Sequence, residues 1–155
     1  MPTLADLLND PKEKERLTRD GTQLVEDEVA AKSGLSGLAI KAALSMVKAV
    51  KPGIIPEVVG NLLPEFAGKL DPILATRPEG TKVAAFVDSR TGEVVNALLS
   101  VTDARADHTS HATLRKAYER LRPMAEKQVA GAVPRLAKML EHSLAEKPAP
   151  VPPAG

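Results

Sequence analysis

Residues 34–51 read GLSGLAIKAALSMVKAVK, and their few polar side chains follow a helical spacing. Lys41, Ser45 and Lys48 are four and then three residues apart, so on a helix they form one narrow polar stripe. The other residues from 38 to 50 are apolar. A helix that is apolar around most of its circumference belongs in the interior of a bundle. The sequence therefore predicts a buried central helix, around which the other segments pack.

The composition favours helices over a sheet. The chain has 155 residues, of which 43% are hydrophobic and 26% charged, so it is long enough to bury a core in one domain. Aromatic residues make up only 2%, and the core must therefore consist of aliphatic side chains, which suit close-packed helices. We predict an all-α, single-domain bundle of about six to eight helices over residues 1–145. The proline-rich residues 146–155 are predicted to form an extended, flexible tail.

Several classes of partner and location are disfavoured by what the sequence lacks. A net charge of +1 and the scarcity of aromatic residues argue against nucleic-acid binding. The absence of cysteine excludes disulfides and thiolate chemistry. The N-terminus has no signal-peptide pattern, and no apolar run reaches the roughly 18 residues that a membrane-spanning helix needs. We therefore expect a cytoplasmic protein with no transmembrane segment.

Charge is unevenly distributed along the chain. Acidic residues outnumber basic ones over residues 1–36, whereas basic residues dominate between 114 and 138. The two segments could attract each other within the fold or across a dimer, which is the interpretation we favour. Alternatively, residues 114–138 could form a basic docking face.

Capping and helix-breaking residues divide the chain into helices. Thr3 and Asp6 fit a capping box for a short first helix, and Pro11 can begin the second. Gly21 weakens the middle of that second helix, which could therefore be two pieces. Pro52-Gly53 ends the central helix. The predicted helices span residues 3–8, 12–32, 36–51, 56–73, 92–103, 113–122 and 123–144, the last begun or interrupted by a proline.

Residues 82–95 allow two interpretations. The apolar run 83–87, a polar turn and Glu93-Val94-Val95 could form a β-hairpin. The same residues could form a short helix, a turn and a new helix capped by Thr91. A lone two-stranded hairpin is only marginally stable, and the sequence offers no third strand. We therefore favour the two helices.

Two segments of the chain resemble each other. Residues 59–70 and 129–140 share their apolar positions and an interior proline, Pro64 in one and Pro134 in the other. An interior proline removes one hydrogen bond and kinks the helix. The bundle could therefore contain two pseudo-repeated helical units, and a chance similarity between two amphipathic helices is the alternative.

Short strings spread along the chain also resemble those of a known family. They are KSGLSG (32–37), KPG (51–53), LP (63–64), ALLSVTDAR (97–105) and VPRL (133–136). With these strings the chain resembles an uncharacterised family of small bacterial all-helical proteins, from Leu4 to about Leu144. The resemblance implies an all-helical fold. It implies no activity, because none is assigned to that family.

The densest group of polar residues is Asp103, Asp107, His108 and His111. On a helix the two histidines lie on one side, and with a carboxylate they could hold a divalent metal. A solvated helix start explains the same residues, and we favour that explanation. Residues 102–105, Thr-Asp-Ala-Arg, are interpreted as a structural tie within the segment or to neighbouring helix ends.

Familiar catalytic patterns are incomplete. Residues 34–37, Gly-Leu-Ser-Gly, bring the second glycine one position too early for a nucleophile elbow, and no strand precedes them. Gly68-Lys69 lacks the upstream glycine of a phosphate-binding loop. We therefore expect a non-enzymatic protein with no cofactor and no metal site.

Two functions of different class fit the sequence. The first is a protein-interaction or self-association module, with a protein partner or a second copy of the chain. The alternative is a carrier or sensor of an apolar, lipid-like ligand bound between kinked helices. Its candidate ligand-binding residues are Lys41, Ser45, Lys48 and Phe66, with the lysines placed to meet a carboxylate or phosphate at the mouth of the site.

Overall fold

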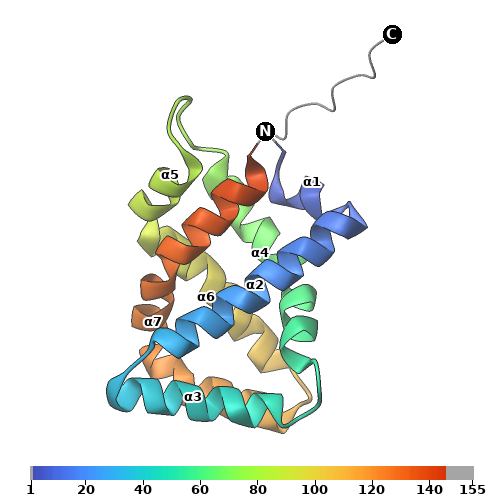
Figure 1. The fold of residues 1–155 in the computed structure, drawn as a ribbon, viewed down its shortest axis with the longest axis vertical. Coiled ribbons are helices and arrows are strands. Elements are labelled where there is room, and N and C mark those ends of the chain that lie inside the picture. The colour runs from blue at the N-terminus through green and yellow to red at the C-terminus, as the bar shows by residue number, and fades with distance from the viewer. Residues whose placement is uncertain (1, 146–155) are drawn as a thin grey trace.

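The computed structural model describes residues 2–145, and Figure 1 shows them as a bundle built of helices. The predicted tail, residues 146–155, lies outside the described residues. The helices of the described chain are α1 (Leu4–Leu8), α2 (Pro11–Ala31), α3 (Gly34–Lys48), α4 (Ile54–Leu74), α5 (Val83–Ser89), α6 (Thr91–His108) and α7 (Ala112–Leu144). The predicted all-α bundle is confirmed.

Polar caps define where α1 and α2 begin, and a glycine in the left-handed conformation precedes α4. The Thr3 hydroxyl accepts a hydrogen bond from the Asp6 amide, and the Asp6 carboxylate accepts one from the Thr3 amide, both at 3.0 Å. The predicted capping box of α1 is therefore present. Asp10 caps α2 by accepting from the Lys12 amide at 2.9 Å. Gly53 precedes α4 with a φ of 76°, a left-handed conformation that glycine adopts without steric cost.

The residues that allowed either a hairpin or two helices form two helices. α5 and α6 are separated by Arg90 alone, where the chain leaves helical geometry and turns. Phe86 and Val87 on α5, and Val94 and Val95 on α6, are all buried. The two helices are favoured because they bury these four apolar side chains in one core. An isolated hairpin would leave the same side chains half exposed.

The long helices continue through residues that usually weaken helices. α2 is unbroken at Gly21, α4 continues through Pro64, and α7 continues through both Pro123 and Pro134. The predicted division into helices 113–122 and 123–144 is therefore wrong. A proline removes one backbone hydrogen bond and keeps a helical φ, so packing can hold the helix together. α7 has that packing, since it contacts α3, α5 and α6 along its length.

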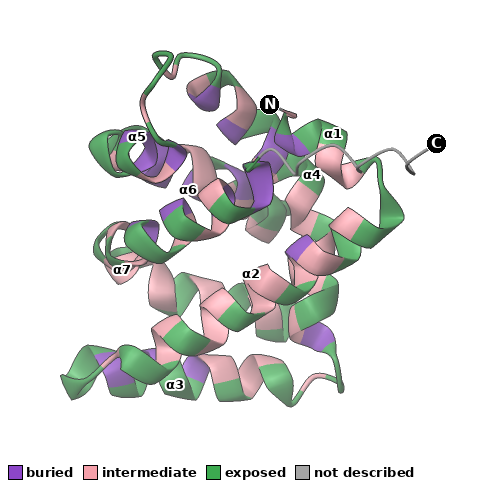
Figure 2. Ribbon diagram, turned by 45° about the horizontal axis from the view of Figure 1, so that its top comes forward, coloured by how far each residue is buried: buried purple, intermediate pink, exposed green. Residues whose placement is uncertain are grey.

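The hydrophobic core lies between α1, α4, α5, α6 and α7. Val133 and Ala137 on α7 are completely buried, and Phe86, Val87 and Val94 lie against the same core. Figure 2 shows buried residues concentrated in this half of the molecule, while α2 and α3 are mostly intermediate or exposed. The central helix of the bundle is therefore α7.

The prediction that residues 38–50 form a buried central helix is wrong. α3 runs across one end of the bundle (Figure 1), and its buried residues are Gly37, Ile40 and Ala43. Leu35 and Leu38 on the other side are 86% and 66% exposed. Much of the apolar character of this segment comes from alanine, whose exposure to water costs little, so the pattern overstated the drive to bury the helix.

The similar segments 59–70 and 129–140 occupy different surroundings. The first lies in α4, which is joined to the preceding α3 by a turn. The second lies within α7, and the residues that precede it from Ala112 onward belong to the same helix, with no turn between them. The two segments are therefore not copies of one helix–turn–helix unit.

Candidate ligand cavity

A cavity of about 400 Å³ lies between the helices, on the side of the core that faces α2. Its lining residues come from six helices and from the turn after α2. They are Leu4 and Leu8 on α1; Leu17, Gly21, Leu24, Val25, Glu28 and Val29 on α2; Lys32; Ile40 on α3; Val59, Leu63, Phe66, Ala67 and Leu70 on α4; Leu98, Leu99 and Thr102 on α6; and Tyr118, Leu121, Met124, Ala125, Gln128, Val129, Ala132, Val133, Leu136, Met139 and Leu140 on α7.

The wall of this cavity is almost entirely aliphatic. The polar side chains among its described lining residues are those of Glu28, Lys32, Thr102, Tyr118 and Gln128. An apolar cavity is a poor site for water and a good site for apolar molecules, because water finds too few hydrogen-bond partners there. The wall therefore suits a hydrocarbon chain.

The cavity exists because the apolar stripe of α2 is not fully covered. Leu17 is buried against the core, whereas Leu24, Val25 and Val29 farther along the helix stay only partly buried. They face the cavity together with Val129 of α7. The sequence thus provides apolar faces on both helices, but their side chains do not fill the space between them.

A cluster of charges lies at the edge of the apolar wall. Glu28 accepts from Lys32 at 3.2 Å and from Arg135 at 2.7 Å, and only 12% of the Glu28 side chain is exposed. The Lys32 ammonium also lies over Gly131, 3.4 Å from where a Cβ would stand. The Glu28–Arg135 pair joins the acidic N-terminal segment to the basic C-terminal one. This contact is of the kind that we expected from the uneven charge distribution.

A second polar group ties α6 to α7 beside the cavity. Arg122 donates to both carboxylate oxygens of Asp103, at 2.8 and 3.2 Å, and the Tyr118 hydroxyl donates to the same carboxylate. The Thr102 and Tyr118 hydroxyls are 2.8 Å apart. The bond from Arg122, with help from Tyr118, holds the pKa of Asp103 below its ordinary value. Burial, with the bond to Asp103, raises the pKa of Tyr118.

These pKa shifts indicate a structural role for the α6–α7 tie. Tyr118 stays protonated and its proton is held by Asp103, while the charge of Asp103 is matched by Arg122. Neither group is placed to act as a free base or nucleophile. The Asp and Arg of residues 102–105 do not pair with each other, since Arg105 donates to Glu65 on α4 at 2.6 Å.

The residues considered for a metal site, Asp103, Asp107, His108 and His111, lie in α6 and at the start of α7. Asp103 is engaged in the α6–α7 tie, His108 ends α6, and His111 precedes α7. Within residues 2–145 no group of three or more histidine, aspartate and glutamate side chains is placed to hold a metal ion.

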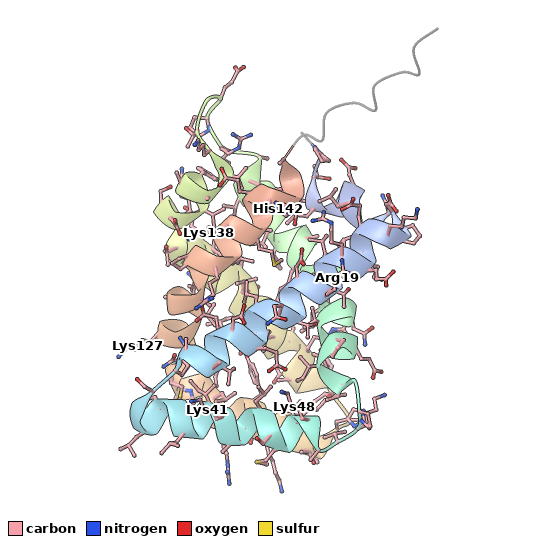
Figure 3. The ribbon with its side chains drawn as sticks, in the orientation of Figure 1. Arg19, Lys41, Lys48, Lys127, Lys138 and His142 are labelled. Carbon is pink, nitrogen blue, oxygen red and sulfur yellow. The ribbon has the colours of Figure 1, made fainter. Side chains whose placement is uncertain are left out.

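The structure separates the four predicted ligand-binding residues. Phe66 lines the cavity. Lys41, Ser45 and Lys48 are exposed on α3, and they lie outside the set of described residues that line the cavity. Figure 3 shows both lysines on this helix at the end of the bundle, and Lys48 pairs with Glu26 of α2 at 2.8 Å. Of the four, Phe66 is therefore the residue that belongs to the described lining of the cavity.

Comparison with known proteins gives a family. The sequence model of a family of unknown function, DUF6918, matches residues 4–144. The chain belongs to that family. No curated protein and no solved structure matches it. Membership in DUF6918 thus agrees with the resemblance found in the sequence, and with the all-helical structure over the same residues.

Most residues that line the cavity of this DUF6918 member look like ordinary core-facing apolar positions in the sequence. Leu17, Leu24, Val25 and Val29 are apolar residues of α2 at helical spacings, and Val129 is an apolar residue of α7. No pattern in a single sequence distinguishes an apolar face that packs from one that borders a void.

No helix within the described residues has both the length and the apolar character needed to cross a bilayer.

Proposed function

We propose that this protein binds an apolar ligand with a long aliphatic part in the cavity between α2, α4, α6 and α7. The single observation that supports this function is the 400 Å³ space with an almost wholly aliphatic wall. That volume falls within the range of small-molecule sites in proteins, roughly 300–1,000 Å³.

The chemistry of the wall narrows the ligand class. The ion pair of Glu28 with Lys32, and the hydrogen bonds around Tyr118, already engage four of the polar side chains that border the cavity, those of Glu28, Lys32, Thr102 and Tyr118. A ligand rich in polar groups would therefore find few partners, and it would lose its hydration on entry. A saturated or unsaturated hydrocarbon chain has no polar groups, so it loses no comparable hydration when it enters the cavity. Each methylene group that enters the cavity contributes about 0.8 kcal/mol.

This proposal is tested by titration with the apolar fluorophore phenylnaphthylamine, followed by displacement with octanoate, laurate and palmitate. Saturable binding is expected, with the displacing affinity rising about fourfold for each added methylene until the cavity is full. Alkanols of the same chain lengths, which carry no charge, should follow the same order. An absence of saturable fluorophore binding, or affinities independent of chain length, would overturn the proposal.

The protein-interaction or self-association role remains a second candidate, in the same non-enzymatic and cytoplasmic setting. The observation that favours it is the exposure of Leu35 and Leu38 on α3, since exposed apolar side chains often mark contact surfaces. Sedimentation velocity over a range of protein concentrations tests it. A monomer at all concentrations would count against self-association.

A further inference from the structure

We propose that the outer face of α3 docks this protein on the surface of an anionic lipid bilayer. The proposal rests on the proposed function, because a bilayer is where a long-chain apolar ligand resides. The surface is defined as the outer face of α3, formed by Leu35, Leu38, Lys41, Ala42 and Ser45.

Apolar side chains form a continuous exposed stripe on this face. Leu35, Leu38 and Ala42 are three and then four residues apart, so they lie along one side of the helix, with the polar Ser45 at its end, and all four residues are exposed. Leu35 and Leu38 are the exposed large hydrophobic residues of the described chain. Ile40 and Ala43 face the opposite way and are buried. The stripe is therefore available to an apolar partner.

The charges of α3 favour a negatively charged partner. Residues 34–53 contain Lys41, Lys48 and Lys51 and no acidic residue. Lys41 has no ion-pair partner among the described residues, whereas Lys48 pairs with Glu26 and Lys51 with Glu57. Lys41 and Lys48 are seven residues apart and flank the apolar stripe on one side. An apolar stripe beside lysines is the pattern of helices that lie in the interface of an anionic bilayer.

The same charges disfavour a second copy of the chain as the occupant. In a symmetric dimer the same patch meets itself, so α3 would pack against the α3 of the other copy. Lys41 and Lys48 of the two copies would then approach each other without acidic residues on either helix to separate them. Anionic lipid head groups meet the lysines with charges of opposite sign.

α3 also lies between the outer surface and the cavity. Ile40, on the inner side of this helix, lines the cavity, and Leu38 on its outer side is exposed. Figure 1 shows the helix crossing one end of the molecule, so docking through its outer face would hold the cavity close to the bilayer. A ligand could then pass between bilayer and cavity without crossing bulk water.

The test is flotation of the purified full chain with vesicles of seven parts phosphatidylcholine to three parts phosphatidylglycerol, with pure phosphatidylcholine vesicles alongside. The wild type should float with the anionic vesicles, and much less with the neutral ones. Binding should weaken as the salt concentration rises. Lys41→Glu should reduce binding by roughly thirtyfold, since each lysine near an anionic surface contributes about a factor of five and the substitution reverses the charge.

Two further variants complete the design. Leu35→Ser with Leu38→Ser should weaken vesicle binding by about tenfold or more while leaving the fold intact, because both side chains are already exposed. Lys138→Glu makes the same charge change on α7, far from α3 in Figure 3, and should alter binding by less than about twofold. Circular dichroism verifies that each variant keeps its helices.

The outcomes separate this proposal from the proposed function. Phenylnaphthylamine binding in buffer without vesicles should be unchanged in the α3 variants, because Leu35, Leu38 and Lys41 are not among the described residues that line the cavity. Loss of vesicle binding with retained fluorophore binding supports docking through α3. Equal flotation of wild type and variants would overturn it. A wild type that does not bind vesicles but forms a dimer in sedimentation velocity, with the double leucine variant monomeric, would also overturn it.

Discussion

The carboxylate of Asp71, in the last turn of α4, accepts a hydrogen bond from the backbone amide of Leu4 at 2.8 Å. Its second oxygen accepts from the amide of Ala5 at 3.0 Å. These bonds satisfy amides at the start of α1, which have no partner within the helix. Leu4 and Leu8 of this short helix line the cavity. A side chain of α4 therefore holds in place the helix that closes one part of the cavity.

Asp71→Ala should release α1 from α4. We expect a loss of about 1 kcal/mol in the free energy of unfolding, as for other capping residues. The amides of Leu4 and Ala5 should lose protection from hydrogen exchange, and phenylnaphthylamine should bind more weakly because part of the wall is lost. Asp107→Ala, at an exposed position on α6, is the matched control. Unchanged exchange at both amides in Asp71→Ala would contradict this role.

Ala132→Leu should partly fill the cavity. Ala132 is partly buried and lines the wall, so the larger side chain enters existing space. Phenylnaphthylamine affinity is expected to fall by about tenfold. The free energy of unfolding should stay level or rise by up to about 1 kcal/mol, because filling a void restores packing contacts. Ala104→Leu on the exposed face of α6 is the control and should change neither quantity. Full affinity in Ala132→Leu would place the ligand elsewhere.

Phe86→Ala and Leu38→Ala compare the core around α7 with α3, the helix that the sequence predicted to be central. Phe86 is 3% exposed in the core between α5 and α7, so its truncation should cost about 3–5 kcal/mol in urea unfolding. Leu38 is 66% exposed, and its truncation should cost less than about 0.5 kcal/mol. A larger loss from Leu38→Ala than from Phe86→Ala would restore α3 as the central helix.

Asp103→Asn should make stability less dependent on pH in acid. The folded pKa of Asp103 lies below its ordinary value of 3.8, chiefly because Arg122 donates to the carboxylate. The folded state therefore favours the charged form, and this contribution is complete above 3.8 and is lost as the pH falls through the folded pKa. Since Asp103 and Arg122 are about two-fifths exposed, we expect a loss of less than about 1 kcal/mol at neutral pH.

Urea unfolding of wild type and Asp103→Asn at neutral and at strongly acidic pH measures this difference. The two proteins should differ at neutral pH and converge in acid, where the wild-type carboxylate is protonated. A difference that grows as the pH falls would contradict the assignment.

Local features of the fold could be predicted well from the sequence. The capping box of Thr3 and Asp6, the start of α2 at Pro11 and the turn at Gly53 follow from the local chemistry of those residues. The helices at residues 82–95 could also be predicted, because the alternative hairpin had no third strand. Local sequence determines such features directly, so a single sequence is enough to predict them.

Tertiary placement could not be predicted in the same way. The apolar residues of α3 suggested a buried helix, yet Leu35 and Leu38 are exposed and α7 occupies the centre. Which apolar face finds a partner depends on all the other helices, and Pro123 within α7 shows that packing overrides a local helix breaker. The cavity follows from the same cause, since Val25 and Val129 look like core residues in the sequence and border a void in the structure.

Native mass spectrometry of the protein purified from its own host tests the central claim most directly. The account predicts a species heavier than the bare chain by one bound molecule, and recovery of an aliphatic compound when the sample is extracted with organic solvent. Ala132→Leu, purified in parallel, should retain less of it. A wild-type protein that carries only the mass of the bare chain, yields no such compound and fails to bind phenylnaphthylamine would contradict the account.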